Sequence, residues 1–316
     1  MSYLWPIHLI YGIGLFVVGT VVGSFLNVCI YRIPWEKSVI WPDSRCPKCL
    51  AAIETRDNIP ILGWLMLRGS CRSCGVAIPA RYALVELLVG VLFVCVYVSD
   101  GMFPYLFSSD YVRDDMTLAI KVLYHALLVS FLIAVTFIDA DLMIVPASIT
   151  NLGILLGLAI GTAFPGVRPA PSMATTYWGG LGVGLLGMAV GGGIIWVIRT
   201  LGTIAFRREA MGSGDIHILA MIGAFLGWEA AVVTPFLAAF VGLVPALWKF
   251  ASYLAKRLAG RKYNSTDREM PFGPYLSIAA LILLLAWPWA WPRALQPHFN
   301  IASEIFWFLL GRDEGR

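Results

Sequence analysis

The sequence has little charge for its length. Only 13% of its 316 residues are Asp, Glu, Lys or Arg, whereas 59% are hydrophobic, and the mean hydropathy is +0.78. In soluble domains about a quarter of the residues are charged, so this composition excludes a soluble globular protein. Repeated apolar runs long enough to cross a bilayer instead predict a polytopic membrane protein.

Cysteine is also scarce. The chain has six, too few for a disulfide scaffold of this length. Four of them form two pairs with the spacing of metal ligands, Cys46 with Cys49 and Cys71 with Cys74, and 21 residues separate the pairs. This spacing fits a small zinc ribbon of two knuckles, and a site made of cysteines alone is closed and structural. We therefore predict a structural zinc site in a reducing compartment; the alternative is four thiols without a metal.

The apolar runs predict an all-α protein with about eight transmembrane helices. The predicted spans are residues 7–30, 83–98, 118–138, 148–164, 177–198, 216–228, 230–251 and 275–291. The polar segment 31–81 carries eight of the 23 Lys and Arg, so the positive-inside rule places this insert in the cytoplasm. This orientation puts the N-terminus outside and predicts outer loops at 99–117 and 165–176.

The chain divides into four parts. These are a first transmembrane helix at 1–30, the cysteine insert at 31–81, a membrane-embedded core at 82–293 and a C-terminal tail at 294–316. Within the tail, the segment 301–310 is too short to cross a bilayer and predicts an interfacial helix anchored by Trp307.

Two aspartates lie at the ends of apolar runs, where a carboxylate is costly and marks a candidate functional site. Asp139 closes the run 127–139, and Asp215 ends a Gly-Ser-Gly-Asp turn; both fall on the inner side of the predicted topology. Two carboxylates that share a site do not both ionise easily, so one holds a proton while the other activates water. We predict that they form the catalytic pair of a peptidase, one as general base and the other as general acid.

The residues around the second aspartate are predicted to support it. Gly212 and Gly214 can adopt positive φ and let a substrate backbone approach the turn closely. His217 comes two residues after the aspartate, so on a helix it points away and is predicted to be solvated or to face the substrate.

Glu86 lies one turn inside the second predicted span. Two interpretations stay open for it. It is either an interfacial carboxylate, snorkelling or paired with Arg81, or a carboxylate that contacts the substrate.

The motifs, taken in order, resemble those of the type IV prepilin leader peptidases. The matching stretches between residues 23 and 274 are GSFLNVCIYRIP, CPKC, NIPILGWLMLRGSCRSC, RYALVELL, FIDADLMIVP, GSGDIHILAMIGAFLGW and PFGP. The resemblance implies a membrane-embedded aspartyl protease with a GxGD motif. Such enzymes cut the basic leader of prepilins and pseudopilins on the cytoplasmic side of the bacterial inner membrane. Asp139 then matches the first aspartate of the IDxD motif, Asp215 the GxGD aspartate and Asp141 a supporting position.

The resemblance also implies a second activity. Many members methylate the new N-terminal amine with S-adenosylmethionine, and the four-cysteine loop is associated with them, so 31–81 becomes the expected methyltransferase region. The expected partners are prepilin or pseudopilin substrates and membrane lipid, with no nucleic acid, because topology already explains the positive charges. Three positions depart from the family pattern: Ala147 replaces an aspartate, Ala83 a proline and His217 a lysine.

Other functions are compatible with parts of the sequence. One alternative is a peptidase without methyltransferase activity. A carboxylate-based transporter is another, but it predicts an inverted repeat, which the sequence does not show. A membrane scaffold whose insert binds a secretion partner predicts that both aspartates tolerate substitution.

Overall fold

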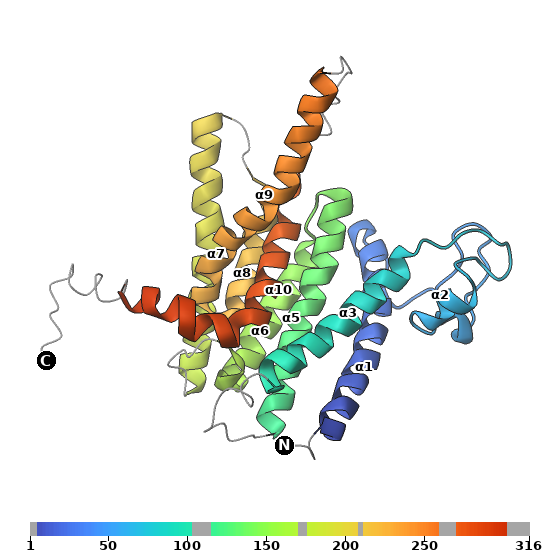
Figure 1. The fold of residues 1–316 in the computed structure, drawn as a ribbon, viewed down its shortest axis with the longest axis horizontal. Helices are drawn as coiled ribbons and strands as arrows, with labels where there is room; N and C mark the ends of the chain where they lie inside the picture. The colour runs from blue at the N-terminus through green and yellow to red at the C-terminus, as the bar shows by residue number, and fades with distance from the viewer. Residues whose placement is uncertain (1–4, 103–114, 170–175, 208–210, 259–269, 302–316) are drawn as a thin grey trace, which may run out of the picture.

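The computed structural model describes residues 5–102, 115–169, 176–207, 211–258 and 270–301, which form a bundle of helices (Figure 1). The long helices are α1 (Trp5–Arg32), α3 (Arg81–Tyr97), α5 (Asp115–Leu142), α7 (Tyr177–Phe206), α9 (Trp228–Leu258) and α10 (Gly273–Ala290). Two shorter apolar helices are α6 (Ala147–Ala163) and α8 (Gly214–Leu226). Among the described residues, six helices are long and apolar enough to cross a membrane. The predicted all-α, multi-pass membrane fold is confirmed.

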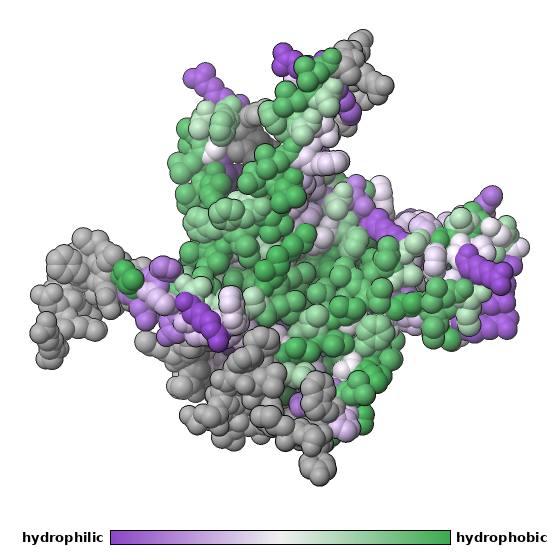
Figure 2. Space-filling model, in the orientation of Figure 1, coloured by the Kyte–Doolittle hydropathy of each residue, from purple (hydrophilic) through white to green (hydrophobic). Residues whose placement is uncertain are grey.

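Helix α8 is the centre of the bundle. It packs against α6, α7, α9 and α10, and every residue from Ile218 to Leu226 is buried. At one side of the bundle, α1 packs mainly against α3, and both contact α5 (Figure 1). The apolar outer surface of the bundle is the surface expected of helices in lipid (Figure 2).

Glycine allows α7 and α8 to touch backbone to backbone. A methyl group added at Gly187 of α7 would overlap the carbonyl oxygen of Gly223 in α8. Close approach of this kind replaces the hydrophobic driving force that helices lack in lipid.

Several helices are longer than predicted. Helices α7 and α9 extend seven or eight residues beyond their predicted ends, to Phe206 and Leu258. Helix α3 continues as the π-helix η3 (Val98–Met102), and α10 continues through the π-helix η6 (Trp291–Leu295) and a further turn to Ile301. The predicted interfacial helix at 301–310 falls almost entirely outside the described residues.

Two charged residues predicted in outer loops are buried instead. Asp100 lies in η3, where His125 Nδ1 is 2.6 Å and Lys121 Nζ is 3.4 Å from its carboxylate oxygens. Arg168 follows the short helix η4 (Pro165–Val167) and donates to the carbonyls of Gly161 and Gly180 at 2.8 Å.

Both burials have a physical reason. Arg168 also donates to Ala224 O at 3.2 Å, near the end of α8. Helices α6 and α8 are short, so their last carbonyls end inside the protein and need donors. The guanidinium supplies these donors, and the carboxylate of Asp100 is matched by the ammonium of Lys121 and the imidazole of His125, both from α5.

Candidate functional site

Asp139 lies near the end of α5 and is only 6% exposed. The backbone N–H of Gly273, in the first turn of α10, donates a hydrogen bond to its carboxylate. A carboxylate at a helix N-terminus is stabilised by the free N–H groups and the helix dipole. A side chain at position 273 would overlap this carboxylate, so the glycine of the PFGP motif is required by the close approach of α10.

Asp215 occupies the first turn of α8 and is also 6% exposed. It therefore lies at a second helix N-terminus. The Asp139 carboxylate is close enough for its charge to act on Asp215, and Ile218, one turn into α8, approaches the same Gly273. The structure thus brings the two sequence-predicted aspartates together, at the end of the bundle where α5 ends and α8 and α10 begin.

The glycines beside Asp215 do not use their conformational freedom. Neither Gly212 nor Gly214 has positive φ. Gly214 is instead needed for space, because a methyl group there would lie 2.6 Å from the side chain of Val145. His217 is exposed, whereas Asp215 is buried, as expected for a residue that points away from the aspartate.

The polar residues of α3 have partners outside that helix. Glu86 is 8% exposed and accepts a hydrogen bond from the backbone N–H of Ile61 at 2.7 Å. Arg81 forms an ion pair with Asp141 at 2.5 Å, so the alternative in which Arg81 pairs with Glu86 has no support. The Arg81 guanidinium also lies 5.1 Å from the ring centroid of Phe137, so the start of α3 packs on the last turns of α5.

The cysteine insert contains two similar knuckles. In the first, Leu50 N donates to Cys46 O and Cys46 N to Ala51 O; in the second, Gly75 N donates to Cys71 O and Cys71 N to Val76 O. Leu50 and Gly75 occupy equivalent left-handed positions, with φ of 59° and 68°. The remaining elements of the insert are η1 (Ile33–Trp35), η2 (Thr55–Asn58) and the short helix α2 (Leu62–Met66).

The four sulfurs are arranged as a tetrahedral metal site requires. They lie within 4.8 Å of one another, with Cys46 Sγ 3.8 Å from Cys74 Sγ and Cys49 Sγ 4.0 Å from Cys71 Sγ. A zinc ion about 2.3 Å from each sulfur would separate them by about 3.8 Å. The predicted four-cysteine cluster fits zinc.

The protonation of the cluster also favours a cation. Backbone hydrogen bonds from Cys49 and Lys48 lower the pKa of Cys46 to about 6, which favours the thiolate form of this sulfur. A hydrogen bond from the Val76 backbone favours the thiolate of Cys74 too. Desolvation and the neighbouring sulfurs nevertheless raise the pKa of Cys74 to about 11. A bound metal ion would remove that opposition, because it deprotonates its thiol ligands.

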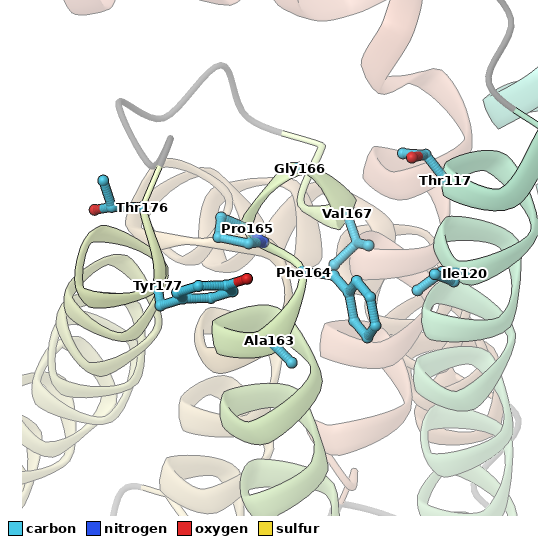
Figure 3. A pocket seen from close by; sticks show the side chains of 9 residues that line it. All are labelled: Thr117, Ile120, Ala163, Phe164, Pro165, Gly166, Val167, Thr176 and Tyr177. Carbon is cyan, nitrogen blue, oxygen red and sulfur yellow. The ribbon is translucent and has the colours of Figure 1, made fainter.

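A cavity of about 380 Å³ lies far from the aspartates (Figure 3). It is lined by Thr117 at the start of α5, Ala163 at the end of α6 and Tyr177 at the start of α7. These are the helix ends opposite to those that hold Asp139 and Asp215, so this cavity is not part of the candidate site.

Two contacts of the site do not follow from the sequence. The first is made by Gly273, which belongs to the PFGP motif. Arg199 of α7 donates to Met211 O at 3.1 Å and so holds the segment that leads into the Gly-Ser-Gly-Asp turn. A charged residue near the inner end of a span was the available signal for Arg199, but its partner depends on the tertiary fold.

Comparisons with known proteins agree with this geometry. Residues 17–99 match the bacterial peptidase A24 N-terminal domain, and residues 126–247 match the type IV leader peptidase family. A prepilin leader peptidase/N-methyltransferase of Myxococcus xanthus is 37% identical over 268 residues, which cover 85% of this chain and 70% of the relative. The chain belongs to the type IV leader peptidase family.

Further relatives carry the same printed name. The protein of Neisseria gonorrhoeae is 33% identical over 294 residues, covering 85% of this chain and 88% of the relative. That of Aeromonas salmonicida is 32% identical over 295 residues, covering 85% and 89%. No solved structure matches the chain significantly. The first family match, residues 17–99, includes the cysteine insert. The second, residues 126–247, includes Asp139 and Asp215.

Proposed function

We propose that this chain cleaves the leader peptide of prepilins or pseudopilins, with Asp139 and Asp215 as its catalytic pair. The observation that carries the proposal is the pairing of two buried carboxylates at the N-termini of α8 and α10, in a chain of the type IV leader peptidase family. The relatives' names support the substrate class.

The pair supplies acid and base to one peptide bond. The ionised carboxylate takes a proton from water, which attacks the scissile carbonyl, and the protonated carboxyl donates to the carbonyl oxygen. Collapse of the tetrahedral intermediate breaks the C–N bond as the leaving amine takes up a proton. Because interacting carboxylates titrate as a unit, we assign the two roles to the pair and not to either residue.

We propose that the same chain then methylates the new N-terminal amine, as the relatives' names indicate for those proteins. S-adenosylmethionine would supply the methyl group, and the cysteine insert, residues 31–81, is the proposed region for this step. The proposed metal of the four cysteines is zinc, in a structural role, because a closed tetrahedral site has no open position for catalysis.

The proposed location is the bacterial inner membrane, with the aspartates and the insert on the cytoplasmic side. The distribution of Lys and Arg supports this orientation. A role as a transporter has no support from the relatives, which are named as peptidases.

The test is incubation of the purified chain with a model prepilin, followed by mass measurement of the product. We expect loss of the leader and, with S-adenosylmethionine present, a further gain of one methyl group. An intact prepilin would contradict the peptidase function. Leader loss that is never followed by methylation would remove only the methyltransferase function.

A further inference from the structure

The short helix α2 in the cysteine insert has one apolar face that no described residue covers. Leu62, Leu65 and Met66 are 56%, 54% and 58% exposed. The opposite face is packed, because Gly63 is buried and the indole N–H of Trp64 donates to Ile78 O at 3.0 Å. Three adjacent apolar side chains in water would be unfavourable by the hydrophobic effect, so this face is expected to have an apolar partner.

The residue that precedes α2 is fixed to the membrane helices. Ile61 N–H donates to Glu86 of α3 at 2.7 Å, and the Ser24 side chain of α1 hydrogen-bonds the same carboxylate. Glu86 itself packs on Gly23 of α1, where a methyl group would overlap it. The position of Ile61 along the membrane normal is therefore set by α1 and α3.

This attachment point lies well below the inner end of α1. Ser24 precedes Arg32, the last residue of α1, by eight residues, which is about 12 Å along a helix. Arg32 is also the first Lys or Arg of the chain, so it marks where the apolar span ends. Each headgroup layer of a bilayer is only about 5–8 Å thick. Measured along α1, the start of α2 therefore lies below the headgroup layer, within the depth of the inner leaflet.

The pictures agree with this depth. The insert lies beside α1 and α3, and does not stand beyond their ends (Figure 1). The hydrophobic surface of the bundle continues onto the near side of the insert, whereas hydrophilic residues gather at its far end (Figure 2).

The backbone at Ile61 is strained in a way that serves this placement. Its φ of 61° and ψ of −53° lie in a region that a β-branched residue strongly disfavours. The half-buried hydrogen bond to Glu86 holds this conformation. Strain of this kind persists only where surrounding contacts impose it.

We propose that α2 is an interfacial helix that lies in the inner leaflet, with Leu62, Leu65 and Met66 against lipid acyl chains and Glu86 as its anchor. The exposed Arg68, two residues after the helix, can extend to the phosphates of the lipid headgroups. Lipid is the partner because the attachment of Ile61 to Glu86 and Ser24 places this apolar face at the depth of the inner leaflet. The cysteine knuckles would then be held at a fixed height beside the aspartate core.

The test uses the full chain in nanodiscs of phosphatidylethanolamine and phosphatidylglycerol. A photo-crosslinking benzoylphenylalanine is placed at Leu65, and the adducts are identified by mass. The matched control is the same substitution at Leu50, which is a leucine of the same insert, 67% exposed, on a cysteine knuckle. We expect lipid adducts when the crosslinker is at position 65, and few or none when it is at position 50.

The anchor is tested in the same experiment. Glu86→Ala removes the acceptor of the Ile61 N–H and leaves that donor unpaired, so the ratio of docked to undocked α2 should fall by about tenfold to a hundredfold, and the adducts at position 65 should fall with it. Glu86→Gln keeps an acceptor for Ile61 and should retain most of them. Adducts to added prepilin or to a second copy of the chain, no adduct at position 65, or equal lipid labelling at position 50 would overturn the proposal.

Discussion

The aspartate core and the cysteine insert are stabilised in different ways. In the core, α8 is buried along nine consecutive residues, and large side chains such as Tyr124 and Phe225 are fully enclosed. In the insert, only Cys46 and Gly63 are buried among residues 33–80. The core is thus held by packing, whereas the insert depends on its cysteines and a few polar contacts, such as the bonds of Arg72 to Asp57 at 2.5 and 2.7 Å. Those bonds also lower the pKa of Asp57.

The largest effect should come from replacing the cysteines, which should unfold the insert and leave the helix bundle folded. Structural zinc in small domains contributes about 10 kcal/mol or more of apparent binding free energy, and an insert with no core has nothing to replace it. Cys46→Ser or Cys71→Ser should abolish zinc binding and make the insert sensitive to limited proteolysis, with little change in the melting temperature of the bundle. Cys95→Ser, a cysteine of α3 outside the cluster, is the control. A protease-resistant insert in Cys46→Ser would contradict the comparison.

Replacing the aspartates should have the opposite effect: leader cleavage is lost, whereas the fold of the chain is kept. Asp139→Asn and Asp215→Asn should each lower leader cleavage by about 10⁴-fold or more, the range seen when an essential catalytic group is removed. Zinc content and proteolysis of the insert should not change. The measurement is the initial rate of model prepilin cleavage together with a metal assay. A variant that cleaves at the wild-type rate would rule out the proposed role of that aspartate.

A substitution within the packed core should cost stability. Gly187→Ala introduces a methyl group against the carbonyl of Gly223, and overpacking of this kind costs about 1–3 kcal/mol. Gly193→Ala in the same helix has open space within 4 Å and is the matched control. Thermal unfolding in detergent should show a lower midpoint for Gly187→Ala only. Equal midpoints would mean that glycine contacts between α7 and α8 do not determine the stability of the core.

The smallest effect is expected where the two regions meet. Arg81 and Asp141 join the start of α3 to the end of α5, but each side chain is 42% exposed, and such pairs contribute about 0.2–1 kcal/mol. Asp141→Asn should therefore reduce leader cleavage by no more than about fivefold. The exchange Arg81→Asp with Asp141→Arg should restore part of the loss. A loss of cleavage activity as large as that of Asp139→Asn would instead show that Asp141 takes part in catalysis.

Hydropathy and cysteine spacing predict most of what is local. The eight apolar helices and the cysteine cluster lie where the sequence indicates, because bilayer length and metal-ligand spacing are properties of short segments. Asp100 and Arg168 were assigned to loops because a charge in sequence signals exposure, and their buried partners come from other helices.

The candidate site shows the same limit. Asp139 and Asp215 are marked by their cost in a membrane, but the glycine beside Asp139 is contributed by α10, more than 130 residues later. The glycines of the Gly-Ser-Gly-Asp turn permit positive φ, but Gly214 does not adopt it and is required by its contact with Val145. In the sequence, Arg81 is the cation near Glu86, but in the structure Glu86 accepts a hydrogen bond from the Ile61 N–H. In each case the deciding contact joins segments that no local pattern relates.

The central claim is that Asp139 and Asp215 act as one unit on one peptide bond. Comparing the cleavage rates of Asp139→Asn, Asp215→Asn and the double variant tests it most directly, because groups that act together are not additive. We predict that each single replacement removes as much activity as both together. A double variant slower than either single variant by the product of their separate effects would contradict the claim.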